Sequence, residues 1–261
     1  MRSLSIAATG MQAQQTNVEV ISNNIANMTT TGFKRQRAEF QDLLYQNMRR
    51  VGSNSSDAGT IVPTGIQIGA GVKTAAVYRI NEQGNITTTG NSLDLAINGN
   101  GFFQVTLPSG QIAYTRAGSF SLNANSQVVT SDGYLLNPGF TLPQNAVDIS
   151  VDASGQVQAK IDGQVNPAIV GQLTLANFPN AAGLEAIGDN LLLETPASGQ
   201  PVTAVPGSTG FGRITQNALE TSNVNVVTEI TNLIQAQRAY EMNSRVVTTT
   251  DQMLQSITNM K

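Results

Sequence analysis

Few residues in this chain could do acid–base or nucleophilic chemistry, because its 261 residues include no histidine and no cysteine. Without an imidazole or a thiolate, a Ser-His-Asp triad, a Cys-His pair and a zinc site of the usual ligands are excluded within the chain. Paired carboxylates, a Ser/Lys dyad and a metal site of oxygen ligands remain. Any catalysis would therefore depend on acidic side chains or on a lysine.

The carboxylates in the middle of the chain are the first candidates for such chemistry. Most of them stand beside glycine or in turn-forming sequence, where aspartate is favoured because its side chain bonds to nearby backbone. The Asp-Gly pairs also lack the ligand spacing of an EF-hand calcium loop. We therefore predict turn residues rather than catalytic ones, and keep a carboxylate-dependent hydrolase only as a rival. The seven acids are Asp94, Asp132, Asp148, Asp152, Asp162, Glu185 and Asp189.

The lysines and glycines do not form a known catalytic or phosphate-binding motif either. None of the four lysines, Lys34, Lys73, Lys160 and Lys261, stands in a Ser-x-x-Lys arrangement. The run from Gly99 to Gly101 lacks the third glycine and the following helix of a dinucleotide fingerprint, and no P-loop is present. We expect no catalytic residue, no cofactor, no metal and no small-molecule substrate, so the chain is predicted not to be an enzyme.

The charge balance argues against nucleic acid or an anionic membrane as the partner. Lys and Arg number 14 and Asp and Glu number 17, which gives a net charge of -3 without a long basic run. A nucleic-acid site would need clustered positive charge. The modest basic cluster of Lys34, Arg35, Arg37, Arg49 and Arg50 is interpreted as a solvated face. Charged residues make up only 12% of the chain, about half the usual share.

A seven-residue apolar period predicts a long helix at each end of the chain. Near the C-terminus we expect an N-cap at Asn225, Glu229 in the first turn and an end near residue 259, a span of about 50 Å. Glu241 and Arg245 are predicted to form an i, i+4 ion pair. The two periodic rows are Leu4, Met11, Val18 and Ile25, with Ala7, Gln14, Ile21 and Met28 three residues later, and Val226, Leu233, Tyr240, Val247 and Leu254.

The polar faces of these helices indicate what surrounds them. Among the first 29 residues only Arg2 and Glu19 are charged, and the other polar residues are Ser, Thr, Asn and Gln. Neutral groups can bond to other protein surfaces without the desolvation cost of a buried charge. We expect helices packed between subunits, with a coiled coil inside one subunit as the alternative. The predicted intersubunit residues are Leu4, Met11, Val18, Ile21, Ile25, Val226, Leu233, Tyr240, Val247 and Leu254.

Between the helices the pattern changes to a loop and then to short strands. Residues 52 to 71 are rich in Gly, Ser and Thr, which is typical of a loop or an extended arm. Alternating apolar residues over 72–80 and 93–97 predict strands. Turn signals such as Ser109-Gly110, Asp132-Gly133 and Ser154-Gly155 recur mostly every 8 to 15 residues. This spacing favours an antiparallel sandwich or barrel-like domain.

The sequence therefore predicts an α+β protein whose long terminal helices form a coiled-coil-like unit around a central, mainly antiparallel β domain. Residues 1–30 and 221–261 would form one discontinuous helical domain. Residues 31–70 would form an extended arm or connector, and residues 71–220 the β-rich outer domain. The N-terminal stretch becomes polar at Gln12 before a long apolar region develops, so no cleaved signal peptide is expected.

Several motifs resemble those of the bacterial flagellar rod and hook proteins. Asn23-Asn24-Ile25-Ala26-Asn27 followed by Thr31-Gly32-Phe33-Lys34 is similar to their N-terminal signature, and Glu220 to Asn225 with Gln235 to Glu241 is similar to their terminal helix. Asp94 to Ile97, Gly101 to Phe103 and Tyr114 to Phe120 match in the centre. The signature residues are Asn23, Asn24, Ala26, Asn27, Gly32, Phe33, Lys34, Ser222, Asn223, Asn225, Gln237, Arg238, Ala239 and Tyr240.

This resemblance implies a structural subunit of a hollow helical rod that crosses the periplasm, transmits torque and encloses an export channel. The chain is most similar to the distal rod proteins of this family in its length and in the segments 42–46 and 65–72. A proximal rod or hook protein is the alternative. The implied partners are other copies of the chain, proximal rod proteins, the hook protein and the P- and L-ring proteins. Export would need no cleaved signal, and an arm at about residues 46–70 would brace neighbouring subunits. A surface adhesin or carbohydrate-binding β domain with helical stalks is the rival from another class.

Overall fold

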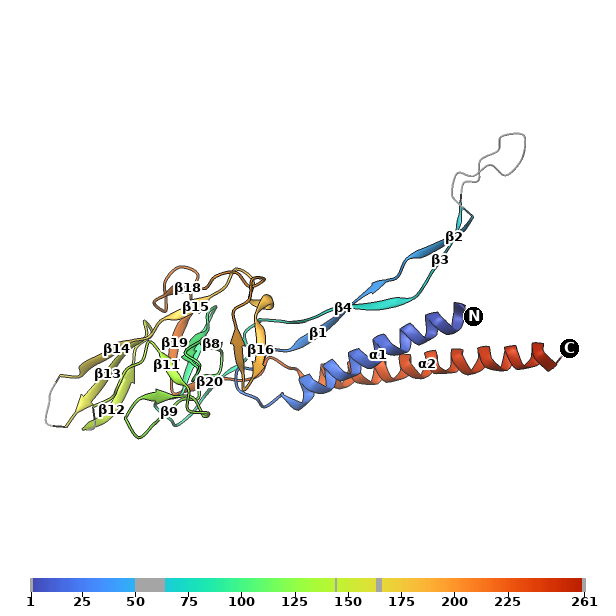
Figure 1. Cartoon of the computed structure of the whole chain (residues 1–261). Helices are drawn as coiled ribbons and strands as arrows, with labels where there is room; N and C mark the ends of the chain where they lie inside the picture. Colours follow the sequence, from blue (N-terminus) through green and yellow to red (C-terminus); the bar gives the residue numbers. More distant parts are fainter. Residues whose placement is uncertain (1, 50–63, 144, 163–165, 260–261) are drawn as a thin grey trace. The chain divides into compact units, whose positions relative to one another are not determined.

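The computed structural model describes residues 2–49, 64–143, 145–162 and 166–259. It has the predicted α+β class, with the helices α1 (Arg2–Ala26) and α2 (Val226–Asn259) at the two ends and strands between them (Figure 1). The chain packs as two compact units. Met1–Ile25, Gln36–Tyr78 and Asn225–Lys261 form the helical unit, and Ala26–Arg35 with Arg79–Val224 form the β unit.

The two helices run side by side and antiparallel within the helical unit, so that the chain termini lie at the same end of the pair (Figure 1). Small residues let them approach. A Cβ on Gly10 would lie 2.8 Å from Asn243 Nδ2. The predicted N-cap of α2 is confirmed, because Asn225 Oδ1 accepts a hydrogen bond from Thr228 N at 3.2 Å.

Two short ribbons complete the helical unit. β1 (Gln36–Asp42) pairs with β4 (Val72–Arg79), and β2 (Tyr45–Arg49) pairs antiparallel with β3 (Ile66–Gly69). The strand predicted over 72–80 is present, yet it pairs with β1 and not with the strands of the β unit. Alternation identifies a strand but not its partner. Most of the loop expected over 52–71 lies outside the described residues, and the three predicted domain ranges stay predictions.

The β unit is built around an antiparallel sheet, as the sequence predicted. Its order is β16 (Glu185–Gly188), β17 (Leu191–Leu193), β8 (Ile112–Thr115), β7 (Phe103–Thr106), β11 (Leu135–Asn137), β10 (Val128–Val129) and β9 (Ser121–Leu122). A second sheet contains β12 (Ala146–Val151), β13 (Gln156–Ile161) and β14 (Ala168–Gln172). Three strand pairs complete the described part: β15 (Leu175–Asn177) with β18 (Val202–Ala204), β6 (Leu95–Asn98) with β19 (Arg213–Gln216), and β5 (Ile86–Thr88) with β20 (Ala218–Glu220). A 3-10 turn, η1, spans Ala181–Gly183.

Predicted turns connect these strands where glycine allows the backbone to reverse. Gly110, Gly133 and Gly155 have φ angles of 82°, 86° and 79° in the turns after β7, β10 and β12. Only glycine adopts this left-handed conformation without strain. The sequence signals at these three turns are therefore confirmed.

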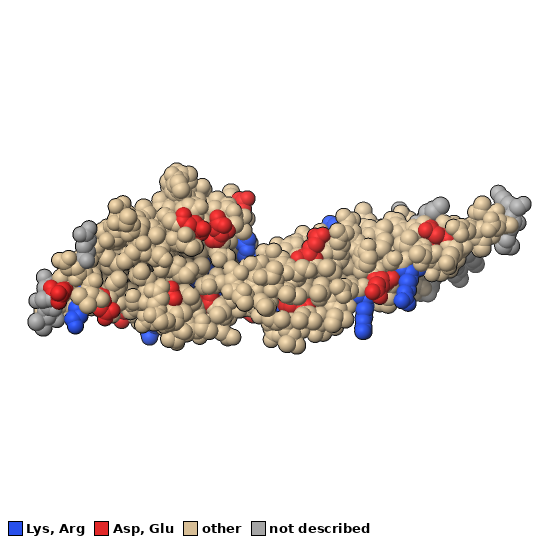
Figure 2. Space-filling model, turned by 90° about the horizontal axis from the view of Figure 1, so that it is seen from below, with Lys and Arg blue, Asp and Glu red and all other residues tan. Residues whose placement is uncertain are grey.

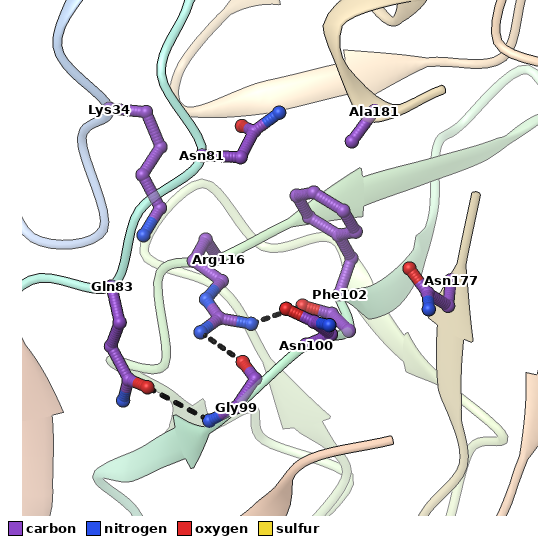
Figure 3. A pocket seen from close by; sticks show the side chains of 10 residues that line it. Lys34, Asn81, Gln83, Gly99, Asn100, Phe102, Arg116, Asn177 and Ala181 are labelled. Atoms are coloured by element: carbon purple, nitrogen blue, oxygen red, sulfur yellow. Dashed lines mark hydrogen bonds between the residues drawn. The ribbon is translucent and has the colours of Figure 1, made fainter. Parts of the chain in front are cut away.

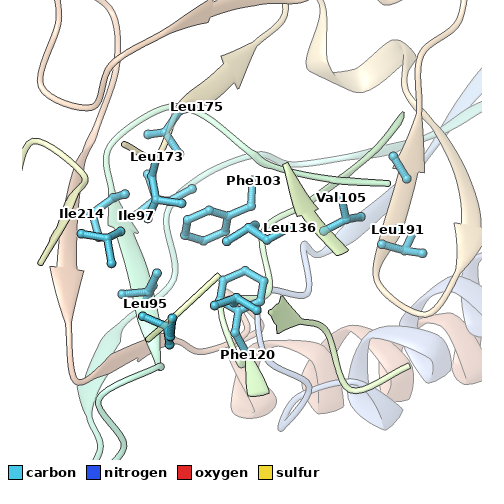
Figure 4. Close-up of a cluster of buried hydrophobic side chains, with 14 of the residues drawn as sticks. Leu95, Ile97, Phe103, Val105, Phe120, Leu136, Leu173, Leu175, Leu191 and Ile214 are labelled. Atoms are coloured by element: carbon cyan, nitrogen blue, oxygen red, sulfur yellow. The ribbon is translucent and has the colours of Figure 1, made fainter. Parts of the chain in front are cut away.

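An apolar core holds the β unit together. The rings of Phe103 and Phe120 meet edge to face, with centroids 5.2 Å apart (Figure 4). Ile97, Leu136 and other buried aliphatic side chains surround them. This core fixes the loops after β6 and β8, which carry the polar groups described next.

Candidate functional site

Asn24 joins three elements of the helical unit. Its side chain is 1% exposed, and its amide forms two hydrogen bonds of 2.8 Å with the backbone of Gln36, one donated and one accepted. The same Nδ2 donates to Glu229 Oε2 at 3.2 Å. One amide thus completes the start of β1 and holds a buried carboxylate of α2, which no apolar side chain could do.

A second contact holds the ribbon on α1. Thr9 Oγ1 accepts a hydrogen bond from Val72 N at 3.3 Å and donates to Ile6 O at 2.8 Å. Gly71 makes this approach feasible, since it has a φ of 122° and a Cβ there would lie 2.2 Å from Thr9 Oγ1. The chain therefore passes from β3 to β4 at a position that only glycine can occupy.

In the β unit, Glu220 holds two buried cations. Its Oε1 lies 2.6 Å from Lys34 Nζ and its Oε2 lies 2.6 Å from Arg116 Nε, and all three side chains are at most 7% exposed. Oε1 also accepts a hydrogen bond from Gly84 N at 2.9 Å. Breaking such a triad by removing one partner is costly, because it leaves an uncompensated charge away from water.

Backbone carbonyl groups accept hydrogen bonds from both cations. Arg116 donates to the carbonyl oxygens of Gly101, Gly99 and Ile97, and Lys34 Nζ donates to Glu82 O at 2.8 Å. Burial lowers the pKa of the Lys34 ammonium, and the hydrogen bond and charge of Glu220 oppose that shift. Figure 3 shows Lys34 and Arg116 at the same small recess, where Gln83 is bonded to Gly99.

The segments at the two ends of the β unit meet at this triad. Gly32 N donates to Glu220 O at 2.8 Å, and Arg35 N donates to Asn223 Oδ1 at 2.7 Å. Asn223 Nδ2 in turn donates to Ile80 O at 2.9 Å. Gly32 has a φ of 69°, and a Cβ there would lie 2.7 Å from Ala117 N. The β unit is therefore closed by contacts between the first and last residues of its sequence.

Some of the predicted signature residues form the contacts described above, and others lie on α2. Asn24, Gly32, Lys34, Asn223 and Asn225 form the bonds described above. Ser222 is buried and accepts a hydrogen bond from Val224 N, and Asn27 Oδ1 accepts one from Thr30 Oγ1. Near the N-terminus, Asn23 and Ala26 are exposed and Phe33 is half-buried. On α2, Ala239 is half-buried and the other signature residues are exposed: Gln237, Arg238 and Tyr240.

The interpretation of the basic cluster as a solvated face was wrong for Lys34. Its side chain is buried in the ion triad, whereas Arg37 and Arg49 are exposed, Arg35 is half-buried and Arg50 lies outside the described residues. A run of basic residues does not show which of them has an acidic partner far away in the sequence.

Most of the residues predicted to pack between subunits are half-buried within the single chain. Their role between subunits stays a prediction. Leu4, Met11, Val18, Ile25, Val226, Leu233, Val247 and Leu254 are half-buried, Ile21 is buried and Tyr240 is 44% exposed. The helix pair instead buries Ala7, Ala13, Val20, Ile21 and Asn24 of α1 and Glu229 and Ala236 of α2.

Much of the outer surface of α2 is apolar. Figure 2 shows how sparse the charged atoms are on one face of the molecule. The predicted ion pair of Glu241 with Arg245 was wrong, because the described residues show no such contact. An exposed pair gains too little to fix two long side chains. The exposed apolar residues of α2 are Val227, Ile230, Ile234, Tyr240, Met242, Val246, Met253 and Ile257.

Between α1 and α2 lies a groove of about 350 Å³. Val18 and Tyr240 supply its apolar lining, and the polar residues Gln15, Gln237, Glu19 and Glu241 line it as well. Both glutamates are exposed, and Glu19 Oε1 accepts a hydrogen bond from Gln15 Nε2 at 3.1 Å. The helical unit thus has an apolar groove with negative charge beside it.

The acidic candidates behave as turn residues where their contacts are described. Asp94 accepts hydrogen bonds from Thr89 Oγ1 and Asn91 Nδ2, and Asp152 accepts one from Ala153 N at 2.7 Å. Within the described ranges, no three His, Cys, Asp or Glu side chains are grouped so that they could hold a metal ion. The helices in those ranges are too short or too polar to cross a membrane.

Three family models match separate parts of the chain. Residues 4–34 match the flagella basal body rod protein model, residues 96–159 the flagellar hook protein FlgE/F/G D1 domain, and residues 215–260 the flagellar basal body rod FlgEFG protein C-terminal model. The flagellar basal-body rod protein FlgG of Caulobacter vibrioides is 62% identical over the whole of both chains. The chain belongs to the FlgG family of flagellar basal-body rod proteins.

Other FlgG relatives agree with this assignment. The protein of Agrobacterium fabrum is 54% identical over 97% of each chain, and that of Buchnera aphidicola subsp. Schizaphis graminum is 51% identical over 99% of each. The predicted family and the predicted distal rod subunit are confirmed. The chain is a structural subunit of the flagellar basal-body rod, and the matched segments contain Asn24, Lys34, Arg116 and Glu220.

Sequence reasoning missed the central role of Arg116 and Glu220. Both stood inside motifs quoted for the family resemblance, but neither was assigned a partner. In a chain with so few charges, an arginine directly after the apolar strand residues 112–115 is the signal that could have marked a buried ion pair.

Proposed function

We propose that many copies of this chain assemble through their helical units into the wall of a stiff, hollow rod that crosses the periplasm, carries torque towards the hook and encloses the export channel. The observation that carries this proposal is the apolar outer surface of α2. Met242, Val246, Met253 and Ile257 recur on one side of the helix at 46% to 64% exposure. An isolated soluble subunit would lose little by carrying charge there, so this surface favours burial in an assembly.

The arm contributes a second apolar surface. Leu44 is 87% exposed, and Tyr45, Met48, Ile66 and Ile68 on the β2–β3 ribbon are also exposed. A two-stranded ribbon is not stable by itself in water and gains from contact with other surfaces. We infer that this arm braces neighbouring subunits and keeps the rod straight.

The expected partners follow from the family. They are copies of the chain itself, proximal rod proteins, the hook protein and the P- and L-ring proteins, and no nucleic acid or small-molecule substrate. We propose export by the flagellar type III apparatus without a cleaved signal peptide. The role is mechanical rather than enzymatic, which agrees with acids that bond to their own turns.

Assembly can be tested in a flagellated bacterium that lacks its own copy of this protein. Met253→Asp places a charge on the exposed stripe of α2, where it leaves the single chain folded but would be desolvated in the rod. We expect no rods in isolated basal bodies and no swimming. Leu233→Asp, in the predicted seam, should also block assembly. Gln255→Asp, on an exposed polar position of the same turn, is the matched control and should build rods.

Normal rods from the Met253→Asp variant would contradict the proposal, because the apolar stripe would then be unnecessary for assembly. Failure of the unaltered chain to restore rods would contradict the proposed function as a whole.

A further inference from the structure

The ion triad of the β unit does not balance its own charge. Lys34 and Arg116 are both cations, whereas Glu220 is the single anion between them. Among the described residues, no other carboxylate forms an ion pair with either cation. Both cationic side chains are 7% exposed, so one net positive charge lies where water reaches it poorly. An uncompensated charge of this kind is costly, and buried charges are normally paired.

The hydrogen bonds of the two cations reveal a matching deficit. An ammonium group has three N–H donors and a guanidinium group has five. Lys34 Nζ donates to Glu82 O and to Glu220 Oε1. Arg116 donates once to Glu220 and once to each of three backbone carbonyl groups. Each cation therefore retains one donor for which the described part of the chain offers no acceptor.

Both cations line one small recess of the β unit (Figure 3). Its volume is about 90 Å³, far below the roughly 300–1,000 Å³ of a pocket for a drug-sized ligand. Asn81 and Asn100 line it too, and their side-chain amides form no hydrogen bond with the described residues. Such amide NH2 groups can donate to an anion. None of the described residues that line the recess is acidic.

We propose that this recess binds a small monovalent anion, of the size of chloride or formate, which neutralises the triad and accepts the remaining donors of Lys34 and Arg116. One negative charge is what the triad lacks. Burial lowers the pKa of Lys34, Glu220 opposes this shift, and the charge of Arg116 adds to it. A bound anion acts in the same direction as Glu220 and keeps the ammonium protonated.

Such a site couples the anion to the closure of the β unit. Lys34 and Glu220 stand near the two ends of the sequence of this unit, and Arg116 directly follows β8 in its middle. The recess with both cations exists only when these segments meet. An anion that binds the folded triad and not the unfolded chain therefore stabilises the folded β unit. This role belongs to the single chain and does not depend on assembly into a rod.

A chloride titration of the full chain tests the site. Sodium gluconate, whose anion is too large for the recess, replaces sodium chloride at constant ionic strength, so that general screening by salt stays the same. Amides of β7 and β8 exchange through opening of the β unit. Their exchange should be about tenfold slower at a chloride concentration about ten times its dissociation constant. Crystals grown with bromide should show an anomalous peak beside Lys34 Nζ.

A built-in carboxylate provides a matched pair of variants. Asn100 is exposed and lines the recess, so Asn100→Asp adds the missing negative charge without disturbing the core. This variant should exchange slowly in gluconate already and lose the response to chloride. Asn125→Asp, in an exposed turn of the same unit, adds the same charge away from the recess and should keep the full response.

Two results would overturn the inference. Equal exchange of the unaltered chain in chloride and in gluconate, with no bromide peak at the recess, would mean that water alone satisfies the two donors. Equal responses of Asn100→Asp and Asn125→Asp to chloride would mean that the anion binds elsewhere. Both results leave the proposed function standing, because assembly into a rod does not enter this experiment.

Discussion

Asn24 Nδ2 donates a hydrogen bond to Glu229 Oε2 at 3.2 Å, although the two residues are 205 positions apart in the chain. The same amide is bonded to both backbone groups of Gln36. The position of α2 beside α1 and the start of β1 therefore depend on one side chain. This relationship explains why an asparagine, rather than an apolar residue, occupies a fully buried position near the end of α1.

Replacing Asn24 by alanine should destabilise the helical unit by about 2–3 kcal/mol, because it leaves a buried carboxylate and two backbone groups without these partners. Urea unfolding followed by far-UV circular dichroism measures the loss. Ser22→Ala, at an exposed position of α1, is the control and should change stability by less than about 0.5 kcal/mol. Equal stabilities of the two variants would show that the junction is not needed.

Replacing Glu220 by glutamine should cost the β unit about 3–5 kcal/mol, since Lys34 and Arg116 would both stay buried without a counter-charge. Hydrogen exchange of amides in the core strands β7 and β8 measures the stability of this unit separately from that of the helical unit. Glu185→Gln, on the exposed strand β16, is the matched control. A loss below about 1 kcal/mol for Glu220→Gln would mean that water already reaches the triad.

Alanine substitutions at two glycines with similar backbone conformations distinguish the cost of backbone strain from the cost of a steric clash. Gly32 and Gly110 have φ angles of 69° and 82°, but a Cβ at Gly110 would meet nothing within 4 Å. Gly110→Ala should cost about 1–2 kcal/mol from backbone strain alone. Gly32→Ala should cost clearly more, because its Cβ would also collide with the backbone at Ala117. Denaturant unfolding of both variants tests this, and equal losses would contradict the close approach.

Thr9→Val keeps the shape of the side chain but removes the acceptor for Val72 N. We expect the amide of Val72 to exchange about fivefold faster, which corresponds to about 1 kcal/mol for one lost hydrogen bond. Thr16→Val is the control, because the hydroxyl of Thr16 bonds only within α1, to Gln12 O. If both variants leave Val72 equally protected, Thr9 does not anchor the ribbon.

Local patterns predicted the elements of this fold well. The N-cap at Asn225 and the turns at Gly110, Gly133 and Gly155 follow from short stretches of sequence, and the structure confirms them. Each of these features depends on hydrogen bonds or backbone angles within a few residues. Periodicity and turn chemistry contain that information directly.

Contacts between distant segments could not be predicted in the same way. Lys34 and Glu220 are 186 positions apart, and nothing in a basic cluster shows which member loses its water. The strand at 72–80 alternates as expected, but its partner β1 precedes it in the sequence and is separated from it by the arm. Glu229 matched the first-turn preference for acids and also became a buried partner of Asn24, a role set by tertiary packing alone.

Hydrogen exchange in the free chain and in isolated rods tests the central claim of assembly through the helical units most directly. The account predicts that amides of residues 242–257 of α2 exchange rapidly in the free chain and become strongly protected in rods, together with those of α1. Equal protection of both helices in the free chain and in rods would contradict it, because the helices would then gain nothing from neighbouring copies.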